Sequence, residues 1–155
     1  MDKGFHLIVK IYNMNQFMNT TPYNDSNIDL FDKEYFICIH SNGWVHSLSH
    51  FDKPHNNVLD IRFDDVDSDG VKQVQWFGGT MKEIAVKKMT TIQAKEIVEF
   101  IDGIPNDATL HIYCAKGKSR STAIAKFTEE YKNNTFLDIS HNQYVYNMLK
   151  EVSNV

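Results

Sequence analysis

The segment 109–125, TLHIYCAKGKSRSTAIA, combines residue types that could bind and attack a phosphate group. An apolar run ends at Cys114, five residues including Gly117 separate this thiol from Arg120, and Ser121 opens a helix-like stretch. Backbone N–H groups of a tight loop that leads into a helix N-terminus converge on an anion. A guanidinium binds two phosphate oxygens at once, and a thiol beside such a site ionises readily and becomes a nucleophile. The spacing therefore predicts a phosphate site with a thiolate facing it.

This predicted loop divides into catalytic and substrate-binding residues. We expect Cys114 to be the nucleophile and Arg120 the catalytic guanidinium. The remaining loop residues are expected to bind the substrate: Ala115, Lys116, Gly117, Lys118, Ser119 and Ser121. The alternative for Cys114 is a buried hydrophobic residue at a strand end, but that leaves the glycine and the loop arginine unexplained. The second cysteine, Cys38, is apolar on both sides and is expected in the core.

Alternating strand and helix patterns predict how this loop is held. Four short β-type runs occupy 6–12, 35–40, 58–63 and 109–114. Helical patterns occupy 14–18, 90–101, about 121–131 and about 142–152, the second of them opening with Thr90 and Gln93 in capping-box spacing. Strands that alternate with helices predict an α/β fold with a central, mostly parallel sheet of about four to five strands flanked by helices. The whole chain, 1–155, is expected to form a single domain.

The stretch 64–89 has a weaker pattern. Four aspartates, at 64, 65, 67 and 69, lead to Gly70, and two further glycines follow at 78 and 79. We expect a long, partly mobile loop that leaves the C-terminal end of a strand, where open α/β sheets carry their ligand sites.

Composition sets limits on partners and location. The chain is mildly acidic, with 16 basic and 20 acidic residues and a formal net charge of −4, so neither a nucleic acid nor a membrane is expected as a partner. Only two of the basic residues are arginines. Two cysteines do not make a disulfide framework, and with no signal-peptide pattern the cytoplasm is the expected location. The oligomeric state is left open.

The loop and its flanks resemble a known family. The run from Tyr113 to Ser121 is similar to the H-C-x-x-G-x-x-R-[ST] loop of the cysteine-dependent protein tyrosine phosphatases, especially small dual-specificity-like members. The run 58–66, VLDIRFDDV, resembles the strand and loop that deliver the family's general acid, and NQYVYNMLK at 142–150 resembles its C-terminal helix. The resemblance covers about 34–152. One departure is Tyr113 in place of the family's histidine, with His111 two residues earlier.

This resemblance implies a two-step mechanism without a metal or a cofactor. The thiolate of Cys114 would attack phosphorus, Arg120 and the loop N–H groups would hold the phosphate oxygens, and a carboxylic acid would protonate the leaving oxygen. Water would then hydrolyse the phosphocysteine, with Ser121 bonded to the sulfur. By register with the family's strand Asp65 is the first choice for the acid, and Asp64 and Asp67 are alternates.

Three functions remain open on the sequence. The first is a phosphatase for phosphotyrosine in a protein or peptide, with or without activity on phosphoserine and phosphothreonine. The second is a phosphatase for a polyanionic non-protein ester, such as a phosphoinositide or an RNA 5′ phosphate, because Lys116 and Lys118 add cations to the loop. The third is a module that binds phosphorylated partners without turnover. We expect His46, His50 and His55 to be exposed loop residues rather than metal ligands.

Overall fold

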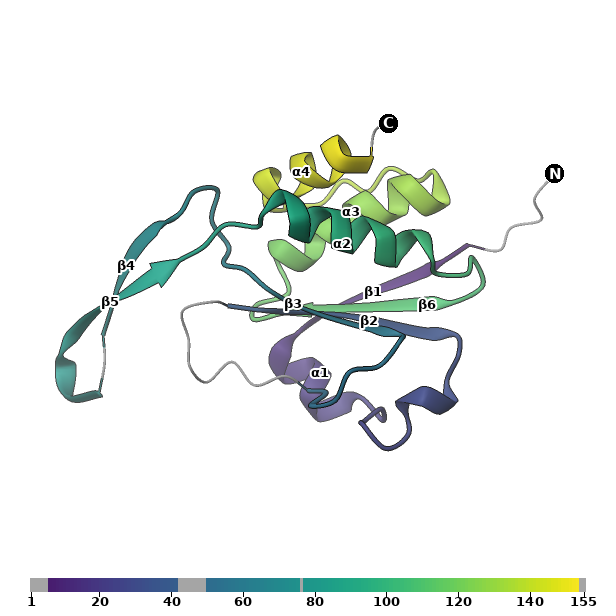
Figure 1. The fold of residues 1–155 in the computed structure, drawn as a ribbon, viewed down its shortest axis with the longest axis horizontal. Coiled ribbons are helices and arrows are strands. Elements are labelled where there is room, and N and C mark those ends of the chain that lie inside the picture. The colour runs from purple at the N-terminus through teal and green to yellow at the C-terminus, as the bar shows by residue number, and fades with distance from the viewer. Residues whose placement is uncertain (1–5, 42–49, 76, 154–155) are drawn as a thin grey trace.

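Four parallel strands form the central sheet of the protein (Figure 1). The computed structural model describes residues 6–41, 50–75 and 77–153. In chain order the strands are β1 (Ile8–Asn13), β2 (Glu34–His40), β3 (Val58–Arg62) and β6 (Thr109–Cys114), and their order across the sheet is β1-β6-β2-β3. Strands β2 and β6 are interior and almost entirely buried, as parallel strands covered on both faces are. The expected parallel α/β sheet is confirmed.

Helices cover both faces of this sheet. Helix α1 (Met14–Thr20) lies on one face, with the short 3-10 turn η1 (Ile28–Leu30) in the chain beyond it. Helices α2 (Thr91–Asp102), α3 (Arg120–Asn133) and α4 (Gln143–Ser153) cover the other face (Figure 1). Helix α2 begins with the expected capping box, in which Thr90 and Gln93 each bond the other's backbone N–H. No helix in the described part of the chain is long and apolar enough to cross a membrane.

Each face of the sheet has its own hydrophobic core. On the α2–α4 side, Leu110, Ile112 and Cys114 of β6 belong to the larger core. On the α1 side, Tyr113 packs in a smaller, aromatic core, because successive strand residues point to opposite faces. Cys38 lies in this second core with no exposed surface, which confirms its expected burial, and burial raises the pKa of its thiol.

The stretch after β3 contains a β-hairpin where the sequence pattern led us to expect a loop. Strands β4 (Gly70–Gln75) and β5 (Met81–Val86) pair antiparallel, and the hairpin extends beyond the edge of the central sheet (Figure 1). Its turn includes the 3-10 segment η2 (Phe77–Gly79), in which both glycines have φ near +80°, a conformation that residues with a Cβ rarely adopt. The expectation of a loop is therefore wrong. The sequence did not indicate these strands because a two-stranded ribbon that buries few side chains needs little alternation of apolar and polar residues.

The base of the hairpin is fixed to the strand exit by Asp64. The Asp64 N–H donates to the Lys87 carbonyl at 2.7 Å, and its carboxylate accepts the Lys87 N–H at 2.7 Å. One residue later the Lys88 N–H donates to Asp69 at 2.9 Å. These three bonds hold the two ends of the excursion together and therefore set where the hairpin begins.

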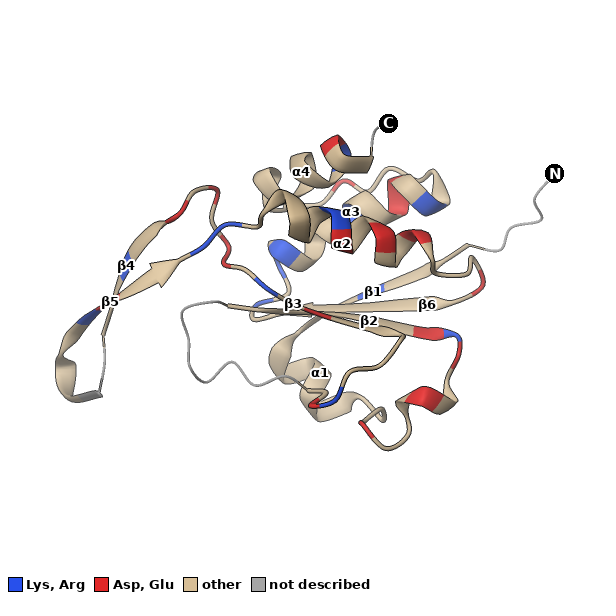
Figure 2. Ribbon diagram, viewed as in Figure 1, with Lys and Arg blue, Asp and Glu red and all other residues tan. Residues whose placement is uncertain are grey.

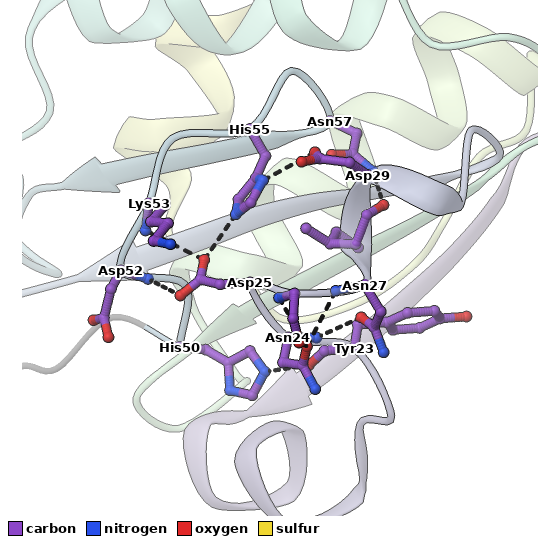
Figure 3. Close-up of polar contacts among 12 residues, drawn as sticks. Tyr23, Asn24, Asp25, Asn27, Asp29, His50, Asp52, Lys53, His55 and Asn57 are labelled. Atoms are coloured by element: carbon purple, nitrogen blue, oxygen red, sulfur yellow. Dashed lines mark hydrogen bonds and ion pairs between the residues drawn. The ribbon is translucent and has the colours of Figure 1, made fainter.

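A buried imidazole joins two loops on the α1 side (Figure 3). The ring of His55 lies between two carboxylates, with Nε2 2.7 Å from Asp25 and Nδ1 2.9 Å from Asp29. The expectation that His55 is exposed is wrong, since its side chain is 3% exposed. His50 bonds the Tyr23 carbonyl at 2.7 Å, and His46 lies outside the described residues. Among the residues described, no three His, Cys, Asp or Glu side chains are grouped as a metal site requires.

We expect this imidazole to make the stability of the protein depend on pH. Two carboxylate acceptors require both ring nitrogens to donate, so the bonds need the imidazolium form. The bond to Asp25, the largest cause, raises the pKa of His55 above its ordinary value of 6.5. The stabilisation is therefore complete below about pH 6.5 and is lost as pH rises through the folded-state pKa.

Urea unfolding at pH 6 and pH 8.5 measures this effect. The wild type should lose more unfolding free energy over this interval than His55→Gln, because the glutamine side chain has no charge to lose while the other titrating groups are common to both proteins. Asp25 does not contribute to the difference, since its pKa is lowered to about 2, chiefly by the bond to His55. Equal losses in the two proteins would contradict the prediction.

Candidate active site

The predicted phosphate loop connects the end of β6 to the first turn of α3. Cys114 is the last residue of β6 and Arg120 the first of α3, so the five residues between them cross the C-terminal edge of the sheet. The Sγ of Cys114 accepts the Gly117 N–H at 3.3 Å and lies 3.2 Å from the Ser121 Oγ. The loop therefore curves around the sulfur, as the sequence predicts.

The thiol of Cys114 ionises more readily than an ordinary cysteine. Its burial by itself raises the pKa. Hydrogen bonds from Ser121 and Gly117 and the charge of Arg120 outweigh that effect and hold the pKa below its usual value. The pKa of Cys38 is raised and that of Cys114 is lowered because their surroundings differ. Of the two thiols, Cys114 has a guanidinium and a helix N-terminus beside it.

Gly117 is required by a close approach between the loop and the end of β1. Its φ is +67°, and a Cβ at this position would lie 2.8 Å from the backbone nitrogen of Asn13 and 2.8 Å from the carbonyl carbon of Tyr12. Both neighbours are backbone atoms, which cannot turn aside as a side chain can. Any larger residue would therefore displace the loop.

Arg120 connects the loop to the segment that carries the aspartates. Its side chain is 5% exposed overall, and Nη1 donates to the Phe63 carbonyl at 2.7 Å and to the Ser41 Oγ at 3.3 Å. Nε and Nη2 have no hydrogen-bond acceptor among the described residues, so these donors are available to an anion in the pocket. The arginine thus positions the exit of β3 and still presents a fork of donors.

The structure brings Asp65 to the rim of the loop. Its Oδ1 accepts the Ser119 hydroxyl at 2.8 Å and the Asn142 side-chain amide at 2.7 Å. Asn142 also accepts the Val145 N–H at 3.0 Å and so caps α4, which fixes the amide in place. Because both donors contact Oδ1, a proton on this carboxyl group resides on Oδ2. That arrangement suits a general acid.

The other two candidate aspartates are placed differently. Asp64 is 7% exposed and anchors the hairpin through Lys87. Asp67 is exposed and lines a neighbouring depression, which Asp65 and Ser119 also line but Cys114 and Arg120 do not. Of the three, Asp65 is the one bonded to the loop and to the start of α4.

A pocket of about 370 Å³ lies between the loop and the hairpin. Cys114 and Arg120 line it together with four of the predicted substrate-binding residues, Ala115, Lys116, Lys118 and Ser119. Gly117 and Ser121 are not on its wall; each contacts the sulfur of Cys114 instead. The hairpin side is lined by Lys72, Val74, Ile84 and Val86.

Tyr113, which stands where the resembled family has histidine, points away from the pocket. Its ring stacks on Phe17 with centroids 4.6 Å apart, and its hydroxyl accepts the His50 N–H at 3.3 Å. His111 lies on the same sheet face and bonds Glu34 and Tyr12 at 2.7 Å and 2.8 Å. Neither side chain contacts the phosphate loop in a described hydrogen bond, so the bonds to the sulfur come from Ser121 and Gly117.

Sequence reasoning missed three contributors to this site. Ser41 follows β2 at the same edge of the sheet, and its position after a parallel strand is a signal that could have found it. Asn142 has N-cap spacing to Val145, but nothing in the sequence shows that its amide reaches Asp65. The hairpin wall depends on a strand pairing that the sequence pattern did not predict.

Comparison with known proteins identifies no relative of this chain. No family model, curated protein or solved structure matches the chain.

Proposed function

We propose that the protein is a hydrolase of phosphate monoesters that uses Cys114 as a covalent nucleophile. The observation that carries the proposal is a thiol of lowered pKa that accepts a loop N–H and lies on the same pocket as Arg120 and Asp65. A thiolate, a phosphate-binding fork and a carboxylic acid are the groups that a phosphocysteine mechanism needs.

The first step transfers the phosphoryl group to sulfur. The thiolate of Cys114 attacks phosphorus, so that an S–P bond forms while the ester P–O bond breaks. The free donors of Arg120 and the loop N–H groups bind the equatorial oxygens, where charge accumulates. Asp65 gives its Oδ2 proton to the leaving oxygen.

The second step regenerates the thiolate. Asp65, now a carboxylate, takes a proton from water as the water oxygen attacks phosphorus. The S–P bond breaks, inorganic phosphate leaves, and the Ser121 hydroxyl donates a hydrogen bond to the departing sulfur. Ser119 and Asn142 hold the carboxylate through both steps because they bond its other oxygen.

Within this class we propose a protein tyrosine phosphatase acting on phosphorylated proteins or peptides in a reducing cytoplasm. The side chains of Val66, Val74, Ile84 and Val86 give the pocket an aliphatic wall opposite the phosphate loop. Such a wall can pack against the ring of a phosphotyrosine. Both described cysteines are free thiols, and a reducing compartment keeps the nucleophile in that form.

A second candidate substrate is a small polyanionic ester. The specific observation in its favour is that three lysines, Lys72, Lys116 and Lys118, line the same pocket. Extra cations would favour a molecule that carries more than one phosphate. The aliphatic wall is the reason for ranking it second, since an inositol ring exposes hydroxyl groups on all sides.

A comparison of substrates tests the proposal. The purified protein should hydrolyse p-nitrophenyl phosphate in the presence of EDTA, should be inhibited by vanadate, and should have a higher kcat/KM for phosphotyrosine peptides than for inositol bisphosphate or 5′-phosphorylated RNA. Hydrolysis of none of these esters between about pH 5 and 8, where a thiolate and a carboxylic acid can coexist, would contradict it. A preference for inositol bisphosphate would favour the second candidate.

Gly117→Ala should lower kcat/KM for p-nitrophenyl phosphate by about 100-fold or more. The added methyl group meets backbone atoms at 2.8 Å and shifts the loop, and a displacement of about 1 Å in a reacting group costs on the order of 100-fold in rate. Gly103→Ala is the matched control, because a Cβ there meets its neighbours at 3.7 Å and the φ of −82° suits alanine. Wild-type kinetics in Gly117→Ala would contradict the role of this close approach.

A further inference from the structure

One face of the hairpin combines an aliphatic surface with a cation. Lys72 pairs with Ile84 across the two strands, and Val74 lies two residues from Lys72 on the same face. All three line the pocket, whereas Val71 and Gln73, the residues on either side of Lys72, point to the opposite face and do not. The pocket is therefore bounded by the phosphate loop on one side and by a mixed apolar and basic strand face on the other.

The cations on this pocket exceed what one phosphate group requires. Arg120 and the loop N–H groups already serve the scissile phosphate, and Lys72, Lys116 and Lys118 add three positive charges. None of these three lysines has an ion-pair partner in the part of the chain that the structure describes. Of the two carboxylates on the pocket, Asp64 accepts the backbone N–H of Lys87, and Asp65 accepts the Ser119 hydroxyl and the Asn142 side-chain amide.

The aliphatic residues of the pocket favour one kind of negatively charged substrate over another. If an inositol phosphate bound here, Val74 and Ile84 would contact its hydroxyl groups. Such a contact buries no apolar surface of the ligand and so adds no hydrophobic binding energy. A peptide places a phenyl ring there and carries its further negative charges on neighbouring side chains. Figure 2 shows basic residues on both strands of the hairpin, which are Lys72 on β4 and Lys82 on β5.

We propose that the β4–β5 hairpin is the substrate-recognition element of this enzyme and that Lys72 selects phosphotyrosine segments with Asp or Glu beside the phosphotyrosine. The inference rests on the proposed function for the identity of the phosphorylated residue. Lys72 is a specificity-determining residue and takes no part in the bond changes at phosphorus. Because Lys72 is exposed, its contact with a substrate carboxylate is worth about a twofold to fivefold factor in kcat/KM and weakens with salt.

Two matched peptides test the proposal. One carries Glu at the two positions on each side of phosphotyrosine, and the other carries Gln at the same positions. The wild type should prefer the Glu peptide in kcat/KM, and the preference should shrink between 50 mM and 500 mM NaCl. Lys72→Gln should lose most of the preference, so that its kcat/KM falls further on the Glu peptide than on the Gln peptide or on p-nitrophenyl phosphate. Lys95→Gln, which removes an exposed charge from α2, is the control and should keep the preference.

The outcomes separate this inference from the proposed function. An unchanged Glu/Gln ratio in Lys72→Gln, or an equal loss on every substrate, overturns the role of Lys72 and leaves the phosphatase proposal standing. If the wild type hydrolyses neither peptide, the proposed function fails; fluorescence anisotropy with labelled peptides in Cys114→Ser then tests the hairpin alone. Tighter binding of the Glu peptide that depends on Lys72 supports the inference, and equal binding overturns it. A Lys72-dependent preference for inositol bisphosphate over both peptides also overturns it.

Discussion

Cys114→Ser should lower kcat for p-nitrophenyl phosphate by about 10⁴-fold or more, the scale of loss when a hydrolase loses its covalent nucleophile. A serine hydroxyl keeps nearly the size of the thiol but is not ionised at neutral pH, so no attacking anion remains. The loop N–H groups and Arg120 are untouched, and phosphopeptide binding should therefore persist. Initial rates and binding titrations on the same preparation measure the two effects.

The second thiol supplies the control for this variant. Cys38→Ala removes a cysteine that has no exposed surface and no place in the pocket. It should lower the melting temperature by leaving a small cavity, while kcat per folded molecule stays near that of the wild type. Iodoacetamide should alkylate Cys114 in preference, because its pKa is lowered while that of Cys38 is raised. Residual activity of Cys114→Ser near the wild-type level would exclude a phosphocysteine intermediate.

The central sheet follows from local sequence patterns, whereas the pocket wall does not. The run 109–114 is mostly apolar, with His111 as the polar residue inside it, which is typical of a strand buried on both faces, and the structure places that run second in the sheet. The capping box at Thr90 is equally local, since both partners lie within three residues. The hairpin gives no comparable signal, because most of its side chains are exposed and its charged and apolar residues do not alternate cleanly.

The residues of the candidate site also fall into two groups, those that the sequence predicts and those that only long-range contacts bring together. Cys114, Gly117, Arg120 and Ser121 are neighbours in sequence, so a strand, a turn and a helix start are enough to bring them together. The contact between Asp65 and Asn142 spans 77 positions and depends on how α4 packs against α2 and α3. His55 shows the same limit, because polar neighbours in the sequence suggest exposure while two distant carboxylates bury it.

The choice among the three aspartates is the part of the mechanism that depends most on such long-range contacts. Asp65→Asn should lower kcat/KM for phenyl phosphate by about 100-fold or more, because a poor leaving group needs a proton as the P–O bond breaks. The loss should be much smaller for p-nitrophenyl phosphate, whose leaving group is stable as an anion. The fall in kcat/KM at high pH, which reports loss of the acid's proton, should disappear in the variant. Asp67→Asn removes a neighbouring carboxylate that does not line the pocket and should behave as the wild type.

Asn142 offers a separate test of how this acid is held. Asn142→Ser keeps an acceptor for the helix cap but lacks the amide that donates to Asp65, so α4 should stay folded while the carboxyl group loses one of its two fixed bonds. A positioning role predicts a larger loss on phenyl phosphate than on p-nitrophenyl phosphate, together with a shifted high-pH limb. Equal losses on the two esters would indicate a structural effect alone. If Asp65→Asn shows no dependence on the leaving group, the acid must come from another residue, and Asp64 is then the carboxyl group that remains on the pocket wall.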